Sequence, residues 1–169
     1  EALLYIGPEL APARLVIAGV GDGLAGLQAR ARELGVEERV VWAGWIEHQR
    51  AHVILAAADA VVAPFRDTLV NRAKCPAKVV AGMAMGKAVV AGRVGQNAEY
   101  IEDERSGLLA RPGDARDLAR ALASVLSDRQ LAARLGAAAR QRIWDQFDWD
   151  VRAPQLEAAY RIAGAGEQA

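Results

Sequence analysis

The sequence predicts an α/β fold, a Rossmann-like three-layer sandwich with a parallel sheet and extra C-terminal helices. The pattern of the chain predicts it. Short β-branched runs alternate along the chain with longer stretches of helical periodicity. Such alternation is typical of parallel strands joined by crossover helices, which cover both faces of the sheet. The length of 169 residues suits one domain with a sizeable core, so we expect residues 1–169 to form a single domain.

The first part of the chain contains three predicted strands, at 14–19, 39–44 and 60–63. Apolar residues recur with helical spacing over 24–34, and Gly35 ends that helix, as glycine commonly does. A second helix is expected over 47–58. We expect one sheet, whose core strands are 14–18, 40–43, 60–63 and 89–91.

The second part begins with a loop over 65–75. Pro76 then suits the first position of a helix over 76–85, because that position needs no N–H donor. Two more strands follow at 88–91 and 107–110, separated by a helical turn near 98–101. The C-terminal helices are expected to begin at Asp114, at Ser127 with Gln130 in a capping box, and at Asp148.

The composition excludes several functional classes. The formal net charge is zero, whereas nucleic-acid-binding proteins usually carry a basic excess, so we expect no nucleic-acid partner. No apolar run approaches the roughly 20 residues of a membrane helix, so we expect no membrane span. One cysteine cannot build a disulfide framework, which favours a reducing, cytoplasmic location. Peripheral membrane contact of a longer protein stays open.

Ligands of open parallel sheets bind at the carboxyl ends of the strands. This rule selects the loops 19–23, 44–46, 65–75 and 92–97. Gly19 and Gly21 would let backbone N–H groups approach a phosphate or a sugar. This segment lacks a third glycine at the spacing of the dinucleotide fingerprint Gly-x-Gly-x-x-Gly, so a tight turn is the alternative explanation.

A cluster of cations marks the end of the third loop. The chain has only three lysines, and Lys74 and Lys78 flank the predicted start of one helix, with Arg72 beside them. A helix N-terminus already presents free N–H groups and a partial positive charge. The cluster therefore predicts an anion site suited to a diphosphate, with a solvated basic loop as the alternative.

Other reactive side chains give weaker signals. His48 and His52 stand four residues apart, but no third ligand accompanies them, so we expect no metal site. Cys75 has no histidine near it in the sequence, and we interpret it as a small residue at a helix start. Trp45 differs from the other tryptophans because its loop lies at the predicted ligand-binding end.

The order and spacing of six segments resembles the C-terminal domain of retaining glycosyltransferases of family 4, which have the GT-B fold. The resemblance covers nearly the whole chain. Its segments are LVIAGVGDG at 15–23, LGVEERVVWAG at 34–44, ADAVVAP at 58–64, AMGKAVVA at 84–91, VGQNAEYI at 94–101 and GLLARPGD at 107–114.

The resemblance implies that the chain binds a nucleotide-sugar donor, a UDP-, GDP- or ADP-sugar. It also implies that no metal or other cofactor is obligatory, that the anomeric configuration is retained, and that the acceptor domain and the first strand of this domain are missing. A hexose or related sugar would pass to a glycan, lipid or small molecule, and the fragment alone would not catalyse. Carried over by position, the donor-binding residues are Gly19, Gly21, Trp45, Ile46, Arg72, Lys74, Lys78, Ala81, Gly95 and Gln96.

Ala81 departs from the family pattern. The family commonly has a glutamate there that holds the ribose hydroxyls, and losing it should weaken donor binding by about 1–3 kcal/mol. A non-catalytic relative with a structural or partner-binding role is therefore the second hypothesis. A dinucleotide-dependent oxidoreductase domain is the third, and the imperfect glycine motif argues against it.

Overall fold

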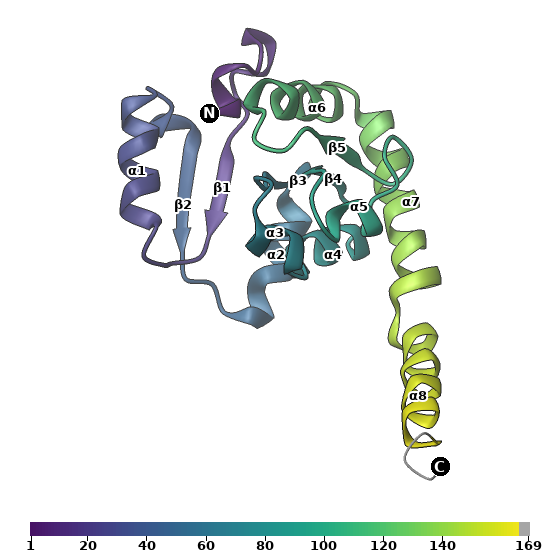
Figure 1. Cartoon of the computed structure of the whole chain (residues 1–169). Helices are drawn as coiled ribbons and strands as arrows, with labels where there is room; N and C mark the ends of the chain where they lie inside the picture. The colour runs from purple at the N-terminus through teal and green to yellow at the C-terminus, as the bar shows by residue number, and fades with distance from the viewer. Residues whose placement is uncertain (166–169) are drawn as a thin grey trace.

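The computed structural model describes residues 1–165, and its five strands form two separate parallel sheets (Figure 1). In one sheet, β1 (Leu15–Ala18) pairs with β2 (Val40–Gly44). In the other, β4 (Ala88–Gly92) lies between β3 (Ala60–Ala63) and β5 (Leu108–Ala110). The predicted α/β class with parallel strands is confirmed. The prediction of one sheet is wrong, because no ladder joins β1 to β3 in the described chain.

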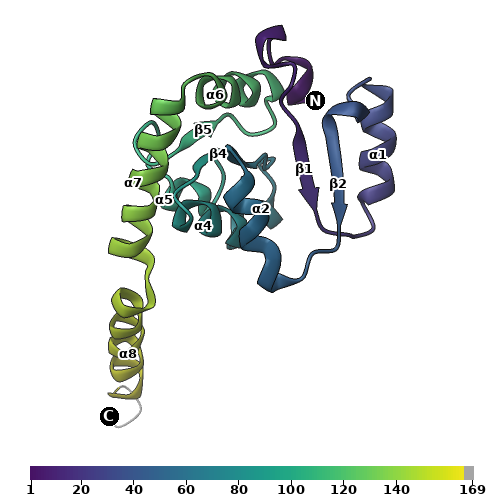
Figure 2. The same ribbon diagram turned by 180° about the vertical axis from the view of Figure 1, so that it is seen from behind.

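Helices flank both sheets (Figures 1 and 2). Short 3₁₀ turns cover Ala2–Leu4, Pro8–Leu10, Glu37–Arg39 and His48–Arg50. The α-helices are α1 (Leu24–Glu33), α2 (Ala51–Ala57), α3 (Leu69–Ala73), α4 (Ala77–Ala84), α5 (Asn97–Tyr100), α6 (Ala115–Ser127), α7 (Arg129–Phe147) and α8 (Trp149–Ala165).

Two predicted features of the segment between β3 and β4 are wrong. The expected loop over 65–75 contains α3, whose start is capped by Thr68: its hydroxyl accepts a hydrogen bond from the Asn71 N–H at 3.2 Å. Pro76 precedes α4 as its N-cap residue instead of occupying the first helical position. A threonine cap followed three residues later by a donor N–H suffices to start one short helix.

The caps of the C-terminal helices are carboxylates. As predicted, Asp114 caps α6, accepting hydrogen bonds from two backbone N–H groups at 2.9 and 3.0 Å. The capping box predicted at Ser127 is wrong. Asp128 caps α7 with two contacts of 2.9 Å, while the Ser127 hydroxyl donates to the Ala123 carbonyl inside α6. Asp148 accepts from the Asp150 N–H at the start of α8, as expected.

The core lies on both faces of the β3–β4–β5 sheet. All five residues of β4 are buried. Val79 and Met83 of α4 pack on one face of this sheet, and Leu118 of α6 and Leu135 of α7 pack on the other. Helices, sheet and helices thus form the predicted three layers. The β1–β2 sheet is more open, since Val16 is 47% exposed and alternates with half-buried neighbours.

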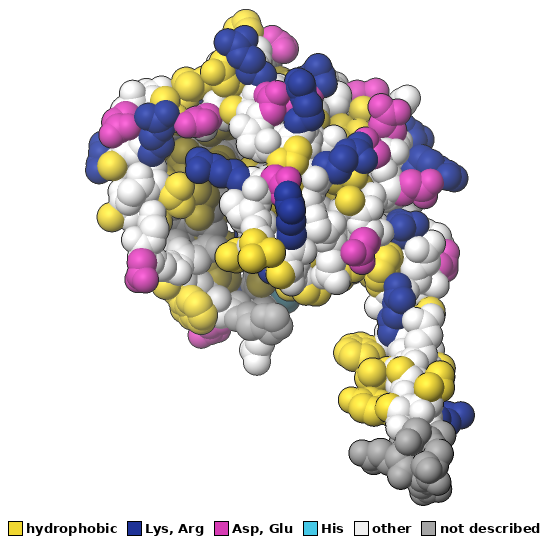
Figure 3. Space-filling view, viewed as in Figure 1, with side chains coloured by type: hydrophobic (Ala, Val, Ile, Leu, Met, Phe, Trp, Pro, Cys, Tyr) yellow, Lys and Arg dark blue, Asp and Glu magenta, His cyan; other side chains and the backbone are white. Residues whose placement is uncertain are grey.

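The long helix α7 crosses the start of β4 at very short range. A Cβ atom added to Gly136 of α7 would lie 2.0 Å from the carbonyl oxygen of Gly86. Beyond α7, α8 extends away from the rest of the molecule (Figures 1 and 2). Hydrophobic side chains are visible on its surface (Figure 3), where Trp149, Tyr160 and Ile162 are 70–77% exposed.

Asp117 ties the start of α6 to the end of β5, and its replacement tests that link. The buried Asp117 carboxylate accepts a hydrogen bond from the Arg111 N–H at 2.7 Å, and this bond, with Arg120 and Arg111 nearby, lowers its pKa. Asp117→Asn is expected to lower the free energy of unfolding at neutral pH by about 1–3 kcal/mol. Because the folded-state pKa is lowered, the wild-type advantage is present above about pH 4 and is lost as the pH falls through the folded-state pKa.

Urea unfolding of both chains from pH 7 down to pH 3 measures this dependence. Asp22→Asn is the matched control, since the Asp22 side chain is exposed. Equal stability of the wild type and Asp117→Asn at pH 7 would contradict the expectation.

Candidate functional site

The structure brings the first two predicted loops together. The Gly19 N–H donates to the Gly44 carbonyl at 2.7 Å, so the loop after β1 lies against the loop after β2. The space in front of the glycines is open, because a Cβ atom built at Gly19 or Gly21 would meet no atom within 4 Å. Trp45 is 74% exposed beside them, and Ile46 is half-buried. This pair of loops therefore offers backbone groups and one large aromatic surface to a ligand.

The two lysines of the third loop converge on one aromatic ring. Lys74 Nζ lies 4.0 Å from the centre of the Phe65 ring, and Lys78 Nζ lies 5.8 Å from it. As predicted, the two lysines flank the start of one helix: Lys74 follows α3 and precedes α4, and Lys78 lies in the first turn of α4. The buried Phe65 ring, two residues after the end of β3, lies under both ammonium groups.

Arg72 is held by a carboxylate of its own loop. Its Nε and Nη2 atoms donate to the two oxygens of Asp67 at 2.5 and 2.8 Å. The hydrogen bond from Arg72 lowers the pKa of Asp67, which is therefore ionised at neutral pH. Both side chains are exposed, so the pair stabilises the fold little and opens readily when a stronger anion competes.

The fourth loop packs against the third. Gly95 has a φ of +49°, and a Cβ atom there would lie 2.5 Å from the Arg72 carbonyl oxygen, so only glycine fits. Next to it, the Tyr100 hydroxyl contacts Gln96 Oε1 at 3.3 Å and Cys75 Sγ at 3.2 Å. Burial and the neighbouring Cys75 raise the pKa of Tyr100 to about 12, which keeps the hydroxyl protonated as a donor. Cys75 thus links the start of α4 to the Gln96 loop.

Ala81 lies on α4 one turn beyond Lys78 and is half-buried. Residues three apart in a helix share a face, so a longer polar side chain at 81 would extend along the same side as Lys78. The methyl group of alanine offers no acceptor there. The surface of α4 beside the two lysines therefore carries positive charge, but it has no carboxylate at 81 for sugar hydroxyls.

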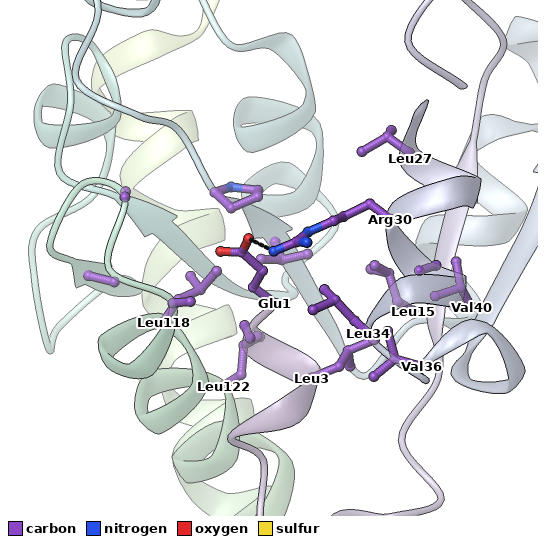
Figure 4. Close-up of a pocket in the computed structure, with 18 of the residues that line it drawn as sticks. Glu1, Leu3, Leu15, Leu27, Arg30, Leu34, Val36, Val40, Leu118 and Leu122 are labelled. Atoms are coloured by element: carbon purple, nitrogen blue, oxygen red, sulfur yellow. Dashed lines mark hydrogen bonds and ion pairs between the residues drawn. The ribbon is translucent and has the colours of Figure 1, made fainter. Parts of the chain in front are cut away.

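The structure places the predicted site residues in two separate groups. One contains Gly19, Gly21, Trp45 and Ile46, and the other contains Arg72, Lys74, Lys78, Ala81, Gly95 and Gln96. No hydrogen bond between described residues joins the loops of the first group to those of the second. An apolar cleft of about 420 Å³ (Figure 4) is lined by none of the ten residues, but Phe65, which lies under the two lysines of the second group, lines it.

Sequence reasoning missed three residues of the second group. Phe65 collects the two lysines, Asp67 holds Arg72, and Tyr100 joins Cys75 to Gln96. The spacing of Tyr100, four residues after Gln96 in a predicted helical turn, was a usable signal. The contacts of Phe65 were not readable, because they depend on how α3 and α4 fold back over the end of β3.

Two further observations bear on ligands and surroundings. Among the side chains that the structure describes, no three His, Cys, Asp or Glu residues gather closely enough to hold a metal ion. The His52 side chain is exposed, and the side chain of His48 lies outside the described residues. Within residues 1–165, no helix combines the length and the apolarity that crossing a membrane requires.

Comparison with known proteins supplies a family for this arrangement. The family model described as glycosyl transferases group 1 matches residues 5–142. A glycogen synthase of Mycobacterium tuberculosis is 32% identical over 156 residues, which are 91% of this chain and 36% of that protein. The chain therefore spans little more than a third of this relative.

Solved structures agree with this fold. HepE of Anabaena in complex with UDP-glucose superposes with a TM-score of 0.73 at 25% identity, over 96% of this chain and 43% of HepE. The C-terminal domain of a glycosyl transferase group 1 family protein from Francisella tularensis gives a TM-score of 0.72 over 87% of this chain and 75% of that domain. At 19% identity, this second likeness shows the fold alone.

Proposed function

We propose that this chain, which belongs to the glycosyl transferases group 1 family, binds the nucleotide-sugar donor of a retaining glycosyltransferase. The observation that carries the proposal is the convergence of Lys74 and Lys78 on Phe65 beside the start of α4, within a domain of this family. The related HepE has been solved with UDP-glucose, which supports a nucleotide sugar as the ligand class.

In the proposed mechanism, the two lysines and the first N–H groups of α4 bind the diphosphate of the donor. Negative charge grows on this diphosphate as the sugar leaves, so cations placed beforehand stabilise the transition state. Arg72 would exchange Asp67 for a phosphate oxygen, for which its planar guanidinium is well shaped. Trp45 and Ile46 would meet the base across the open glycine loops. No metal is required, because side-chain cations supply the positive charge.

The donor would be a UDP-, GDP- or ADP-sugar, and the acceptor a glycan, a lipid or a small molecule. Because the chain spans 36% of the related glycogen synthase, we assign it the donor half of a longer enzyme, whose acceptor domain lies outside this sequence. The single cysteine favours the cytoplasm, with peripheral membrane contact of the longer protein as a further proposal.

A thermal-shift panel with UDP, GDP, ADP and NAD tests the ligand class. A ligand at 100 times its Kd adds about 2.7 kcal/mol to stability, enough to raise the melting temperature measurably. We expect one nucleoside diphosphate to do so and NAD to have no effect. A shift with NAD alone would favour a dinucleotide-binding domain instead.

We further expect the purified 169-residue chain to transfer no sugar. A retaining transferase needs groups from both domains around the anomeric carbon, and the second domain is not in this sequence. Release of nucleoside diphosphate from UDP- and GDP-sugars, followed with and without simple acceptors, measures this against a heat-inactivated control. Release above that control would contradict the expectation.

A non-catalytic role is the second candidate, and Ala81 favours it, since no carboxylate stands there for the ribose. The same thermal-shift panel separates the two: this role predicts no response to any nucleotide in the wild type and none after Ala81→Glu. The donor-binding proposal predicts a response in at least the second chain.

A further inference from the structure

The last turn of α7 packs on α5, the short helix that follows the fourth loop. Tyr100 of α5 is buried, and its ring meets the ring of Phe147, the last residue of α7, edge to face with 4.9 Å between the ring centres. Arg142 of α7 donates from Nε to the Tyr100 carbonyl at 2.8 Å and from Nη2 to the Glu99 carbonyl at 2.9 Å. Figures 1 and 2 both show α5 beside α7. An aromatic pair and two hydrogen bonds therefore attach α5 to the end of α7.

The hydroxyl of the same tyrosine contacts the proposed phosphate site. Because the pKa of Tyr100 is raised to about 12, the hydroxyl carries its proton at neutral pH, and it donates that proton to Gln96 Oε1 at 3.3 Å. The Cys75 thiol, 3.2 Å away, then donates to the hydroxyl oxygen. Cys75 lies between Lys74 and the N-cap residue of α4. One hydroxyl thus fixes both the fourth loop and the segment that joins the two lysines.

The junction between α7 and α8 lies at the other end of these contacts. α7 ends at Phe147 because Asp148 is extended, with a ψ of 152°, and α8 begins at Trp149. The guanidinium of Arg152, in the first turn of α8, lies 4.8 Å from the centre of the Phe147 ring, where a cation is attracted to the aromatic face. Phe147 therefore contacts α8 as well as α5.

We propose that Tyr100 is a positioning residue of the nucleotide-sugar site and that it couples this site to the junction of α7 and α8. The inference rests on the donor-binding function proposed above. While the Tyr100 ring is held by Phe147, its hydroxyl keeps Cys75 and the glutamine loop in the arrangement that a diphosphate requires. When this contact is lost, the free chain populates other arrangements, and the apparent affinity falls with the fraction that can bind.

Coupling of this kind acts in both directions. A ligand that favours one arrangement of the loops also favours the matching arrangement of the junction. The alternative is that the pair of Tyr100 and Phe147 only stabilises the packing of α5, in which case the hydroxyl adds nothing to binding. Removal of the hydroxyl separates the two explanations, because Tyr100→Phe retains the ring and its packing.

Calorimetric titration of UDP and GDP into Tyr100→Phe and Phe147→Leu tests the coupling. The first variant keeps the ring and the second keeps an apolar side chain, so both should fold. We expect each to weaken binding of the nucleoside diphosphate by about threefold or more. Tyr160→Phe is the matched control, because it removes the same hydroxyl from a side chain of α8 that is 70% exposed, and it should bind as the wild type does.

The single cysteine gives a second readout that needs no nucleotide. Cys75 is exposed, but its thiol is held by the Tyr100 hydroxyl. We therefore expect alkylation by iodoacetamide to be about threefold faster or more in Tyr100→Phe and Phe147→Leu, and unchanged in Tyr160→Phe. Mass spectrometry follows the reaction, and circular dichroism checks the fold of each variant.

Hydrogen exchange of the wild type covers the case in which a variant unfolds. Saturating UDP or GDP should slow exchange of the backbone amides in 147–152, although none of these residues belongs to the proposed site. Unchanged exchange there, with a nucleotide bound, would overturn the coupling.

Weaker binding and faster alkylation in both variants, with the control unchanged, support the proposal. It is overturned if either variant leaves both the affinity and the alkylation rate as in the wild type. It is also overturned if the two changes in affinity simply multiply in the double variant, since contacting residues that act through one another are not independent. If neither UDP nor GDP binds the wild type, the donor proposal fails separately: faster alkylation in both variants still supports the link from Phe147 to Cys75, and equal rates overturn it.

Discussion

Replacing Lys78 by alanine is expected to weaken binding of a nucleoside diphosphate by about tenfold or more, since a hydrogen bond to a charged group is worth about 1.5–3 kcal/mol. Lys78 lies in the first turn of α4, and its ammonium group shares the Phe65 ring with Lys74. Lys87→Ala is the matched control, because Lys87 Nζ donates to the Ala56 carbonyl at 2.7 Å and lies outside the proposed site. Calorimetric titration of UDP and GDP into the three chains measures the difference.

The same titrations in an Ala81→Glu background keep the test readable if the wild type binds too weakly. A glutamate there would add an acceptor on the same face as Lys78 and should strengthen binding by about 1–3 kcal/mol. Equal affinities for Lys78→Ala and its parent in both backgrounds would remove this junction as the phosphate site.

Gly136→Ala is expected to lower the free energy of unfolding by about 2–3 kcal/mol. Helix propensity alone would favour alanine by roughly 0.5–1 kcal/mol. The close approach reverses the sign, because the added Cβ would lie 2.0 Å from the Gly86 carbonyl oxygen and would push α7 away from the start of β4. Leu135 and Ala139, both fully buried next to Gly136, would lose packing with it.

Gly26→Ala in α1 is the matched control. It is also a helical glycine, but an added Cβ there meets nothing within 4 Å, so it should gain the propensity term of about 0.5–1 kcal/mol. Urea denaturation of the wild type and both variants gives the two differences. A gain in the free energy of unfolding for Gly136→Ala, like that expected for Gly26→Ala, would contradict the expectation, because the contact at Gly136 would then relax without cost.

The sequence was most informative where local physics decides the structure. The bounds of β3 are those predicted, and β4 differs by one residue, because compact β-branched runs bounded by proline or glycine leave little choice. The cap at Asp114 also follows from local geometry. At 127–128, two potential cap residues stand side by side, and the aspartate, not the serine, caps the helix.

The arrangement of strands was not readable in the same way. The strand pattern predicts that residues 15–18 are extended, but it does not predict which edge of this strand pairs with another strand. The residues of β1 alternate between half-buried and exposed, whereas those of β4 are all buried. This difference follows from the sheets, because β1 belongs to a two-stranded sheet and β4 is the central strand of the other.

The site was predicted in position more than in contacts. The rule that ligands meet the carboxyl ends of parallel strands selected four loops, and the structure brings them together in two pairs, Gly19 with Gly44 and Gly95 with Arg72. The meeting of Lys74 and Lys78 over Phe65 depends on α3. Its five residues turn the chain between the lysines and the strand, and their spacing gave no periodic signal.

The burial of β4 raises the question of what fixes its register. A strand with one solvent-exposed face cannot shift its register by one residue without exposing its apolar side chains. The Ala-Val-Val-Ala run of β4 is apolar on both faces, so this pattern does not fix its register. Close contacts at its two ends take that role. A slip that put Ala91 in the place of Gly92 would drive a methyl group to 2.5 Å from the Phe65 carbonyl, and at the other end α7 fits directly against Gly86. Two glycine contacts therefore hold in place a strand whose own side chains would tolerate displacement.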